Sequence, residues 1–247
     1  MKLDDIPANL LARRWGVPQC TVFRTLSSSL DAIHELAAKG APAGTVVIAE
    51  EQTAGRGRDG RTWRSPIGGV WLAMLLRPPV PAAGALSLRI GLVLADVVDE
   101  LLAAPRARLK WPNDVLVDDR KLAGILCETR WQGATPEWLG VGIGINVANE
   151  IPEELRHSAV ALNEMQLDVR RVDVLDRLVP ALARCGTPSV GLTEQELAAF
   201  AARDWLRGRQ LAQPTLGRAA GLASDGALLV DAATGTVRVR EGSVRLA

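Results

Sequence analysis

The sequence has few of the side chains that build most metal sites and hydrolytic active sites. It contains two histidines, His34 and His157, and three cysteines, Cys20, Cys127 and Cys185. So few histidines argue against a zinc centre or a Ser-His-Asp site. The cysteines are odd in number, lie far apart and show no metal-ligand spacing, so we expect the reduced thiols of a cytoplasmic protein.

Long apolar runs and an excess of charge are also missing. No run approaches the roughly 18 apolar residues of a membrane-spanning helix, and the first residues, MKLDDIPANL, lack the apolar core of a signal peptide. The formal net charge is +1, from 29 basic and 28 acidic residues. No overall field therefore directs the chain toward nucleic acid or an anionic membrane, and we expect neither as a partner.

What the sequence does contain is a succession of apolar patterns with helical and strand periods. Residues 1–26 show no such pattern, and we expect them to be irregular. Serines at 27–29 and a glycine at 40 bracket an amphipathic helix. Further patterns predict strands at 45–49, 69–76, 109–117, 121–129 and 138–146, and helices at 86–101, 172–185 and 194–207. A polar turn at 118–120 joins its two neighbouring strands into a hairpin.

The character of the sequence changes after residue 207. Residues 208–247 hold short β-type runs separated by the turn sequences Ser-Asp-Gly and Thr-Gly-Thr. A β unit of about 40 residues is near the lower limit for a stable core, so we expect it to pack on the rest of the chain. The sequence thus predicts an α+β protein, with a mixed-sheet domain at 1–207 and a small β domain at 208–247.

Residues 51–64 read EQTAGRGRDGRTWR and contain the pattern G-x-G-x-x-G from Gly55 to Gly60. A dinucleotide-binding loop would open a helix and carry an acidic residue about 20 positions later. Here Pro66 and two glycines follow, which break helices, and Leu75 stands in the acid's place. No Gly-Lys-Ser/Thr follows either, so the stretch is neither a dinucleotide loop nor a P-loop.

The same stretch is strongly basic. Its arginines and the acid opposing them are Arg56, Arg58, Arg61, Arg64 and Asp59. A solvated basic loop and a nucleic-acid contact are two alternatives, but nucleic-acid binding normally spreads basic residues over a whole face. Guanidinium groups that fork onto phosphate or carboxylate, glycines that expose backbone amides and a wall from Trp63 favour a loop that wraps a small anion.

Three further patterns follow this loop in the sequence. The sequence KWPND at 110–114 precedes the hairpin and KLAGIL at 121–126 begins its second strand, so Asn113, Asp114 and Lys121 are expected to lie together. That set suits activation of an acid by a nucleotide, although Lys121 alone could be a strand-edge charge. In WLGVGIGIN at 138–146, alternating glycines leave one strand face bare, which predicts close approach of a helix or a ligand.

Together these motifs resemble the biotin–protein ligases, biotin–[acetyl-CoA-carboxylase] ligases. GRGR-x-GR-x-W, KWPND, KLAGIL and GIGIN stand in the family's order and spacing. The resemblance is strong over residues 22–147 and weaker at 226–230 and 242–246, which resemble the family's small C-terminal SH3-like barrel. Only about 20 residues precede the first motif, too few for a helix-turn-helix domain, so no sequence-specific DNA binding or repressor role is expected.

The resemblance implies a two-step, ATP-dependent ligase. Biotin and MgATP would form biotinyl-5′-AMP and pyrophosphate, with ATP and biotin as substrates and Mg²⁺ as the accompanying ion. A lysine of a biotin carboxyl carrier protein would then attack the adenylate and release AMP. The carrier domain of a biotin-dependent carboxylase is thus the expected partner, and a homodimer is left open.

The resemblance also gives roles to individual positions. The catalytic positions are Lys121, Arg58, Asp114 and Asn113; the biotin-binding positions are Ser28, Ser29, Leu30, Gln52, Arg56, Gly57, Arg58, Lys121, Gly124 and Gly142; and the ATP and adenylate positions are Arg56, Arg58, Arg61, Trp63, Lys121 and Asn146. Arg58 would retain the adenylate. Asp114 would accept a proton from the incoming lysine or contact Mg²⁺. Residues 140–144 would admit biotin, while Leu30 replaces the asparagine of many members and puts one hydrogen bond to biotin in question.

Two other functions remain open at this point. A lipoate–protein ligase or octanoyltransferase would share the fold, and the transferase would use a nucleophilic cysteine or an equivalent lysine and no ATP. Cys127 follows the KLAGIL strand, but a small buried core residue is the simpler interpretation of that cysteine. A non-catalytic nucleotide-binding module would keep the glycines without needing Lys121, Asn113 and Asp114 together. Such a module would release no pyrophosphate.

Overall fold

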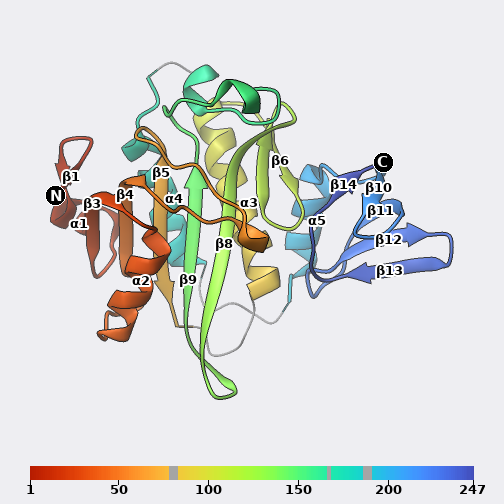
Figure 1. The fold of residues 1–247 in the computed structure, drawn as a ribbon, viewed down its shortest axis with the longest axis horizontal. Coiled ribbons are helices and arrows are strands. Elements are labelled where there is room, and N and C mark those ends of the chain that lie inside the picture. Colours follow the sequence, from red (N-terminus) through yellow and green to blue (C-terminus); the bar gives the residue numbers. More distant parts are fainter. Residues whose placement is uncertain (78–82, 166–167, 186–190) are drawn as a thin grey trace.

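The computed structural model describes residues 1–77, 83–165, 168–185 and 191–247, and a seven-stranded sheet forms its centre (Figure 1). The strands are β3 (Cys20–Leu26), β4 (Val46–Gln52), β5 (Val70–Leu76), β6 (Ala107–Lys110), β7 (Asp114–Val117), β8 (Arg120–Gln132) and β9 (Thr135–Ile145). Their order across the sheet is β3-β4-β5-β9-β8-β7-β6. Only β3 and β4 are parallel, while the other neighbours are antiparallel, which confirms the predicted mixed sheet.

Helices cover both faces of this sheet. They are α1 (Ala8–Trp15), α2 (Ser29–Ala38), α3 (Ala83–Leu102), α4 (Arg171–Arg184) and α5 (Glu194–Arg203). Helix α2 lies over β4, β5 and β9 on one face, and α3 packs on β6 to β8 and against α4 on the other (Figure 1). In β5, Ala73 and Leu75 join the core under α2, whereas Leu72 and Met74 join the core under α3. Burial on both faces is why such strands read as continuous apolar runs.

The expectation that residues 1–26 are irregular is wrong. They form a short hairpin of β1 (Lys2–Leu3) and β2 (Ile6–Pro7), then α1, then β3 at the edge of the main sheet. In the hairpin turn, a carboxylate oxygen of Asp4 accepts a hydrogen bond of 3.0 Å from the Val172 backbone amide, and Asp4 also pairs with Arg171 at the start of α4. Two-residue strands are too short to show a period, and the residues that Asp4 contacts lie 167 and 168 positions away in the sequence.

Two other expected elements differ in their limits. The single strand expected at 109–117 is divided into β6 and β7, because the chain reverses at residues 111–113 and Lys110 pairs across with Asp114. The last helix ends at Arg203 rather than 207. There Asp204 has extended backbone, and its buried carboxylate accepts a 2.9 Å hydrogen bond from the amide of Leu206.

The C-terminal segment forms a separate five-stranded antiparallel sheet, which confirms the predicted small β unit. Its strands are β10 (Gln210–Gln213), β11 (Gly217–Leu222), β12 (Leu228–Ala232), β13 (Gly235–Val239) and β14 (Arg245–Leu246), in the order β13-β12-β11-β10-β14. Buried Trp111 links it to the main sheet, since its indole N–H donates a 2.9 Å hydrogen bond to the carbonyl of Gly226. The domain boundary at 207/208 stays a prediction. Within the described ranges, no helix has both the length and the apolarity to cross a membrane.

Candidate active site

A cavity of about 300 Å³ opens where α2, the loop after β4, the β7–β8 hairpin and the C-terminal sheet meet. Basic side chains outnumber acidic ones on its lining. They are Arg56, Arg58, Arg61, Lys110, Lys121 and Arg245, against Asp59 and Asp114. Because the whole chain carries a formal charge of only +1, positive charge is concentrated here. Such a cavity suits an anionic ligand.

The stretch at 55–64, here called the arginine loop, folds into a narrow hairpin. The Trp63 amide donates to the Gly55 carbonyl at 2.9 Å, and the Gly57 amide donates to the Arg61 carbonyl at 2.7 Å. A Cβ atom on Gly55 would lie 2.4 Å from the Trp63 carbonyl oxygen, so only glycine fits there. An extended segment and β5 follow instead of a helix, which confirms that the loop is not of the dinucleotide-binding type.

The Trp63 indole explains two of the glycines in the neighbouring strands. Gly124 of β8 and Gly144 of β9 are paired across the sheet. A Cβ on Gly144 would lie 2.4 Å from Trp63 Nε1, and a Cβ on Gly124 would lie 3.1 Å from the ring. Trp63 Nε1 is buried and has no hydrogen-bond partner among the described residues. The strand face is therefore bare so that the indole can lie on it and form one wall of the cavity.

Helix α2 covers the rest of the glycine face. A Cβ on Gly142 would lie 2.7 Å from Leu30 Cδ1, and one on Gly140 would lie 3.1 Å from His34. Of the two alternatives, a helix or a ligand, the helix occupies these positions. Gly142 also lines the cavity and Gly140 does not, so the stretch 140–144 is open to a ligand only in part.

The β7–β8 hairpin brings together the three polar residues that the sequence predicted to be neighbours. Lys121 Nζ is 2.6 Å from Asp114 Oδ1 and 4.8 Å from the centroid of the Trp63 ring. The Asn113 side chain donates a 2.8 Å hydrogen bond to the carbonyl of Ile125 and so fixes the start of β7 to β8. The Lys121 ammonium is thus held between a carboxylate and an aromatic face at the edge of the cavity.

Lys110 is a lining residue to which the sequence gave no role. Burial lowers its pKa; Asp114 opposes this shift, and the nearby charges of Lys121 and Arg61 lower the pKa further. Its Nζ also lies 5.2 Å from the centroid of the Trp205 ring. The cavity therefore holds two lysines that repel each other across one carboxylate, and an anionic ligand would relieve that repulsion.

The N-terminus of α2 closes another side of the cavity. The Ser28 hydroxyl caps the helix by accepting from the Leu30 amide at 3.3 Å. Gln52 Oε1 accepts from the Ser29 amide at 2.7 Å and from its hydroxyl at 3.0 Å, while Gln52 Nε2 donates to Ser65 Oγ at 2.7 Å. Gln52 thereby ties the start of α2 to the end of the arginine loop.

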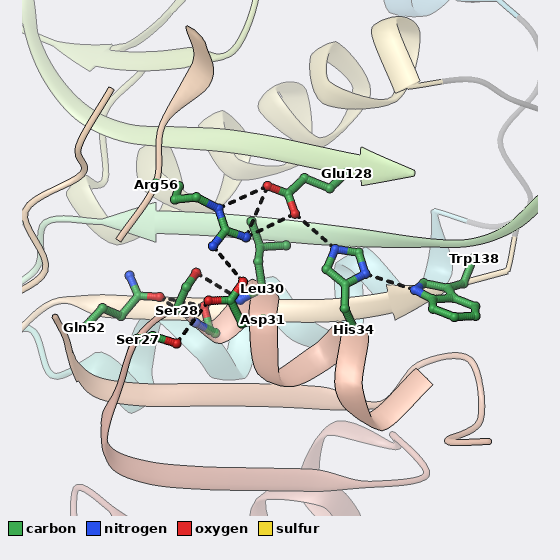
Figure 2. Close-up of polar contacts among 10 residues, drawn as sticks. Ser27, Ser28, Leu30, Asp31, His34, Gln52, Arg56, Glu128 and Trp138 are labelled. Carbon is green, nitrogen blue, oxygen red and sulfur yellow. Dashed lines mark hydrogen bonds and ion pairs between the residues drawn. The ribbon is translucent and has the colours of Figure 1, made fainter. Parts of the chain in front are cut away.

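Arg56 belongs to a chain of polar contacts that the sequence did not reveal (Figure 2). Its guanidinium lies 2.6 Å from Asp31 Oδ1 and 3.2 Å from Glu128 Oε2. Glu128 Oε2 is in turn 3.1 Å from His34 Nε2, and the Trp138 indole donates to His34 Nδ1 at 2.9 Å. Only the unusual place of Glu128 in an apolar strand and of His34 on an apolar helix face could have drawn attention to them.

The charges in this chain stabilise one another. The hydrogen bond from His34, together with those from Arg56, outweighs burial and lowers the pKa of Glu128 to about 2. Burial lowers the pKa of Arg56, but its hydrogen bonds to Asp31 and Glu128 outweigh that effect and raise it. Arg56 and Glu128 are therefore both charged at neutral pH.

The C-terminal sheet supplies a wall that the sequence also did not reveal. Residues 242–245 line the cavity, and the Ser243 hydroxyl donates to Asp59 Oδ2 at 2.8 Å while accepting a hydrogen bond from Arg61. Ser243 and Asp59 are 184 positions apart in the sequence, and no local pattern marks their contact.

The structure places nearly all the site positions named from the sequence on this one cavity. Those that line it are Ser28, Ser29, Leu30, Gln52, Arg56, Gly57, Arg58, Arg61, Trp63, Asn113, Asp114, Lys121, Gly124 and Gly142. Asn146 does not line it: its amide donates to the Val160 carbonyl at 3.2 Å, and its oxygen accepts from Asn149 at 3.2 Å. Over the described residues, no group of three or more His, Cys, Asp or Glu side chains could hold a metal ion.

Cys127 is poorly suited to act as a nucleophile. It lies on a second cavity, of about 420 Å³, which the arginine loop also lines, and burial raises the pKa of its thiol to about 12. The reactive form of a cysteine is the thiolate, which is scarce at neutral pH with such a pKa. This geometry argues against a cysteine-dependent transferase.

Known proteins are similar to this chain in sequence and in fold. The model of the biotin/lipoate A/B protein ligase family matches residues 23–146. The bifunctional ligase/repressor BirA of Bacillus subtilis is 32% identical over 235 residues, which cover 90% of this chain and 72% of that protein. The biotin–[acetyl-CoA-carboxylase] ligase of Mycobacterium tuberculosis is 42% identical over 150 residues, covering 58% of this chain and 54% of the relative.

The solved structures lead to the same family. A biotin protein ligase from Aquifex aeolicus, in complex with biotin and ATP, superimposes with a TM-score of 0.79 at 29% identity and covers 93% of this chain and all of that one. The family match spans the helix, loop and strands that build the cavity, and the structural match extends over the C-terminal sheet. The chain belongs to the biotin/lipoate A/B protein ligase family.

Proposed function

We propose that this chain is a biotin–protein ligase that activates biotin as biotinyl-5′-AMP and transfers it to a lysine of a biotin carboxyl carrier protein. The observation that carries the proposal is the cavity, whose lining is strongly basic in a chain of nearly neutral net charge. Relatives named as biotin–[acetyl-CoA-carboxylase] ligases and a neighbour solved with biotin and ATP support the choice of substrates.

In the first step, a carboxylate oxygen of biotin attacks the α-phosphorus of ATP, and the bond from that phosphorus to the pyrophosphate oxygen breaks. Both reacting groups are anions, so their repulsion must be offset as they approach. Lys121 and Arg58 line the cavity as the cations that would hold these oxygens. Fixed charges of this kind are most effective where negative charge develops in the transition state.

In the second step, the neutral ε-amine of the carrier lysine attacks the acyl carbon, and the bond to the AMP oxygen breaks. A lysine has an ordinary pKa of about 10.4 and must first lose a proton. Asp114 is the acceptor that we propose, and in the free enzyme its Oδ1 is held by Lys121 at 2.6 Å. Contact of Lys121 with the adenylate phosphate would release that carboxylate for the incoming amine.

The remaining assignments follow from position. Trp63, with its unpartnered buried Nε1, and Arg61 are proposed for the nucleotide end of the cavity. Asn146 does not line the cavity, and its role at the nucleotide stays a prediction from the sequence. Ser28, Ser29, Leu30, Gln52, Gly124 and Gly142 are proposed for biotin. Mg²⁺ would enter as MgATP, because a single nearby carboxylate plus phosphate oxygens suffices for it. Asp114 lines the cavity and would be that carboxylate in the first step, before its role toward the carrier lysine in the second.

The partner and the place of action follow from this chemistry. A carrier domain of a biotin-dependent carboxylase would present its lysine to the cavity. We propose that the protein works in the cytoplasm, where the free cysteines Cys20, Cys127 and Cys185 stay reduced. A homodimer and the absence of DNA binding stay predictions, which sedimentation and DNA-binding measurements on the purified chain would test.

Pyrophosphate exchange into ATP tests the activity directly. The purified chain is given ATP, labelled pyrophosphate, Mg²⁺ and, in turn, biotin, lipoate or octanoate. Exchange that requires biotin is the expected result. Exchange with lipoate instead would assign the chain to the other branch of its family, and no exchange with any of the three acids would make it a binding module.

A further inference from the structure

We propose that Lys110 is the residue that holds the pyrophosphate leaving group of ATP during adenylation, and that Trp205 is a positioning residue that orients it. The inference deepens the proposed function and rests on it, because pyrophosphate leaves this cavity only if a nucleotide is activated there. Lys110 is the last residue of β6, the edge strand of the main sheet, and it lines the cavity.

The main sheet carries residues of the cavity in a fixed order. Lys110 of β6 pairs with Asp114 of β7. Asp114 in turn pairs with Gly124 of β8, which pairs with Gly144 of β9. Side chains at directly opposed positions of neighbouring strands lie on the same face of a sheet. Lys110 therefore shares a face with Asp114 and stands at one end of this row, while the indole of Trp63 lies on the two glycines.

The order of the row matches the order of the groups around the α-phosphorus. Biotin is proposed for the end of the cavity where α2 begins, and α2 lies over β9, whereas Lys121 of β8 is proposed for the reacting oxygens. In phosphoryl transfer, the attacking and leaving oxygens are roughly in line, with the phosphorus between them. The leaving pyrophosphate must therefore extend away from α2, toward β7 and β6. Lys110 lies at that end.

Lys110 has no counter-ion of its own. Among the described residues its ammonium makes no ion pair and no side-chain hydrogen bond, whereas the ammonium of Lys121 lies 2.6 Å from Asp114 Oδ1. Burial lowers the pKa of Lys110; Asp114 opposes this shift, and the charges of Lys121 and Arg61 lower the pKa further. A partly desolvated cation among other cations is stabilised by an anion that binds beside it, and pyrophosphate carries several negative charges.

Trp205 fixes the direction of the Lys110 side chain. The Lys110 ammonium lies 5.2 Å from the centroid of the Trp205 ring, and the Arg209 guanidinium carbon lies 3.9 Å from it. The indole is itself held, because its N–H donates a 2.6 Å hydrogen bond to Asp119 Oδ1 in the β7–β8 turn. The face of an indole attracts a cation without neutralising it. The Lys110 ammonium is thus oriented and keeps its charge for a ligand.

Biotin-dependent exchange at varied pyrophosphate concentration tests the assignment. Lys110→Met and Lys110→Gln are two neutral variants, and Lys110→Arg restores a cation. The KM for pyrophosphate should rise about tenfold or more in both neutral variants, because a charge-assisted contact is lost, while the KM for biotin should stay at the parent value. Lys110→Arg should recover most of the affinity. Transfer from supplied biotinyl-5′-AMP to a carrier domain should keep its rate in all three, since pyrophosphate has left before that step.

Binding is measured separately from the reaction by titration calorimetry, with and without biotin. The probes are AMP and α,β-methylene-ATP, in which carbon joins the α- and β-phosphorus atoms so that adenylation cannot occur. Lys110→Met should bind the methylene analogue about tenfold more weakly and AMP as well as the parent does.

Lys39→Met is the matched control, because it makes the same change of charge at an exposed residue at the end of α2, outside the cavity lining. It should match the parent in every assay. Trp205→Leu should raise the KM for pyrophosphate a few-fold without changing the KM for biotin. Trp205→Phe keeps an aromatic face and should raise it less.

An unchanged KM for pyrophosphate in both neutral variants would overturn the inference. Equal weakening of AMP and the methylene analogue would also overturn it, because Lys110 would then act at the α-phosphate or the nucleoside. Slower transfer from supplied biotinyl-5′-AMP would place the lysine in the second step instead. A parent chain that shows no biotin-dependent exchange, but prefers the methylene analogue to AMP through Lys110, would refute the proposed function and leave this phosphate site standing.

Discussion

Two arginines of the same loop, two positions apart, have opposite surroundings. Arg56 is bonded to two carboxylates, one from α2 and one from β8. Arg58 lines the same cavity but makes no ion pair and no side-chain hydrogen bond with any described residue. A basic motif can therefore hold two kinds of residue, one that is satisfied by the protein and shapes the loop, and one that is left to bind the ligand.

Lys121 gives the strongest test of this comparison, because it forms an ion pair with Asp114 and also lines the cavity. Lys121→Ala should lower biotin-dependent pyrophosphate exchange by about 10²-fold or more, since a cation is lost where charge develops. The neighbouring Arg120→Ala is the control: Arg120 pairs with Glu164, is not on the cavity lining and should leave exchange near the parent rate. A near-normal rate for Lys121→Ala would remove this lysine from the chemistry.

The comparison itself is sharpened by changing each arginine to glycine. Arg58→Gly should release the adenylate roughly tenfold faster, because one charged contact is lost, and unrelated proteins in the assay should then become biotinylated. Its melting temperature should stay at the parent value. Arg56→Gly should lower the melting temperature, since Glu128 and Asp31 lose their partner. Equal melting temperatures for the two variants would break the distinction.

Acid titration gives a further test of the pairing between Arg56 and Glu128. The pKa of Glu128 is about 2 in the folded chain, below its ordinary value. The pairing should thus contribute on the order of 1–3 kcal/mol of stability above about pH 4.5, a contribution lost as the pH falls toward 2. Urea unfolding at a series of pH values gives the free energy of unfolding of the parent and of Glu128→Gln. The difference between the two free energies should become smaller as the pH falls over this range. If the difference in free energy of unfolding does not change with pH, packing rather than charge is responsible for the stabilisation.

The smallest effect is expected at Ser243, where the C-terminal segment contacts the arginine loop. Ser243→Ala removes the hydroxyl between Asp59 and Arg61, which are largely exposed. Contacts of this type contribute at most about 1 kcal/mol, so the KM for ATP should rise only a few-fold and the melting temperature should not change. A loss of stability as large as that of Glu128→Gln would mean that the two contacts stabilise the chain equally.

The features that sequence predicted well are those with short-range causes. The cap of α2 at Ser28, the β7–β8 hairpin and the meeting of Asp114 with Lys121 each depend on residues within a few positions of one another. The features that it missed join distant segments. Arg56 and Glu128 are 72 positions apart, His34 and Glu128 are 94 apart, and Asp59 and Ser243 are 184 apart.

The glycines show the same limit in another form. Their alternation in β9 correctly indicated that something lies close to that face, but a strand pattern cannot identify the neighbour. The neighbours are Leu30 and His34 of α2 and the indole of Trp63, which come from two earlier segments of the chain. Only the three-dimensional packing decides which glycine makes room for the protein itself and which faces the cavity.

The wall contributed by Ser243 also has a consequence for how the protein is made. A ribosome adds residues in order, and the main sheet with its helices can be complete while residues 242–245 are still to be added. The pocket then has an open side, and the arginine loop lacks its contact with Ser243. Full activity should therefore begin only after residues 242–245 have been added and the C-terminal sheet has folded against Trp111.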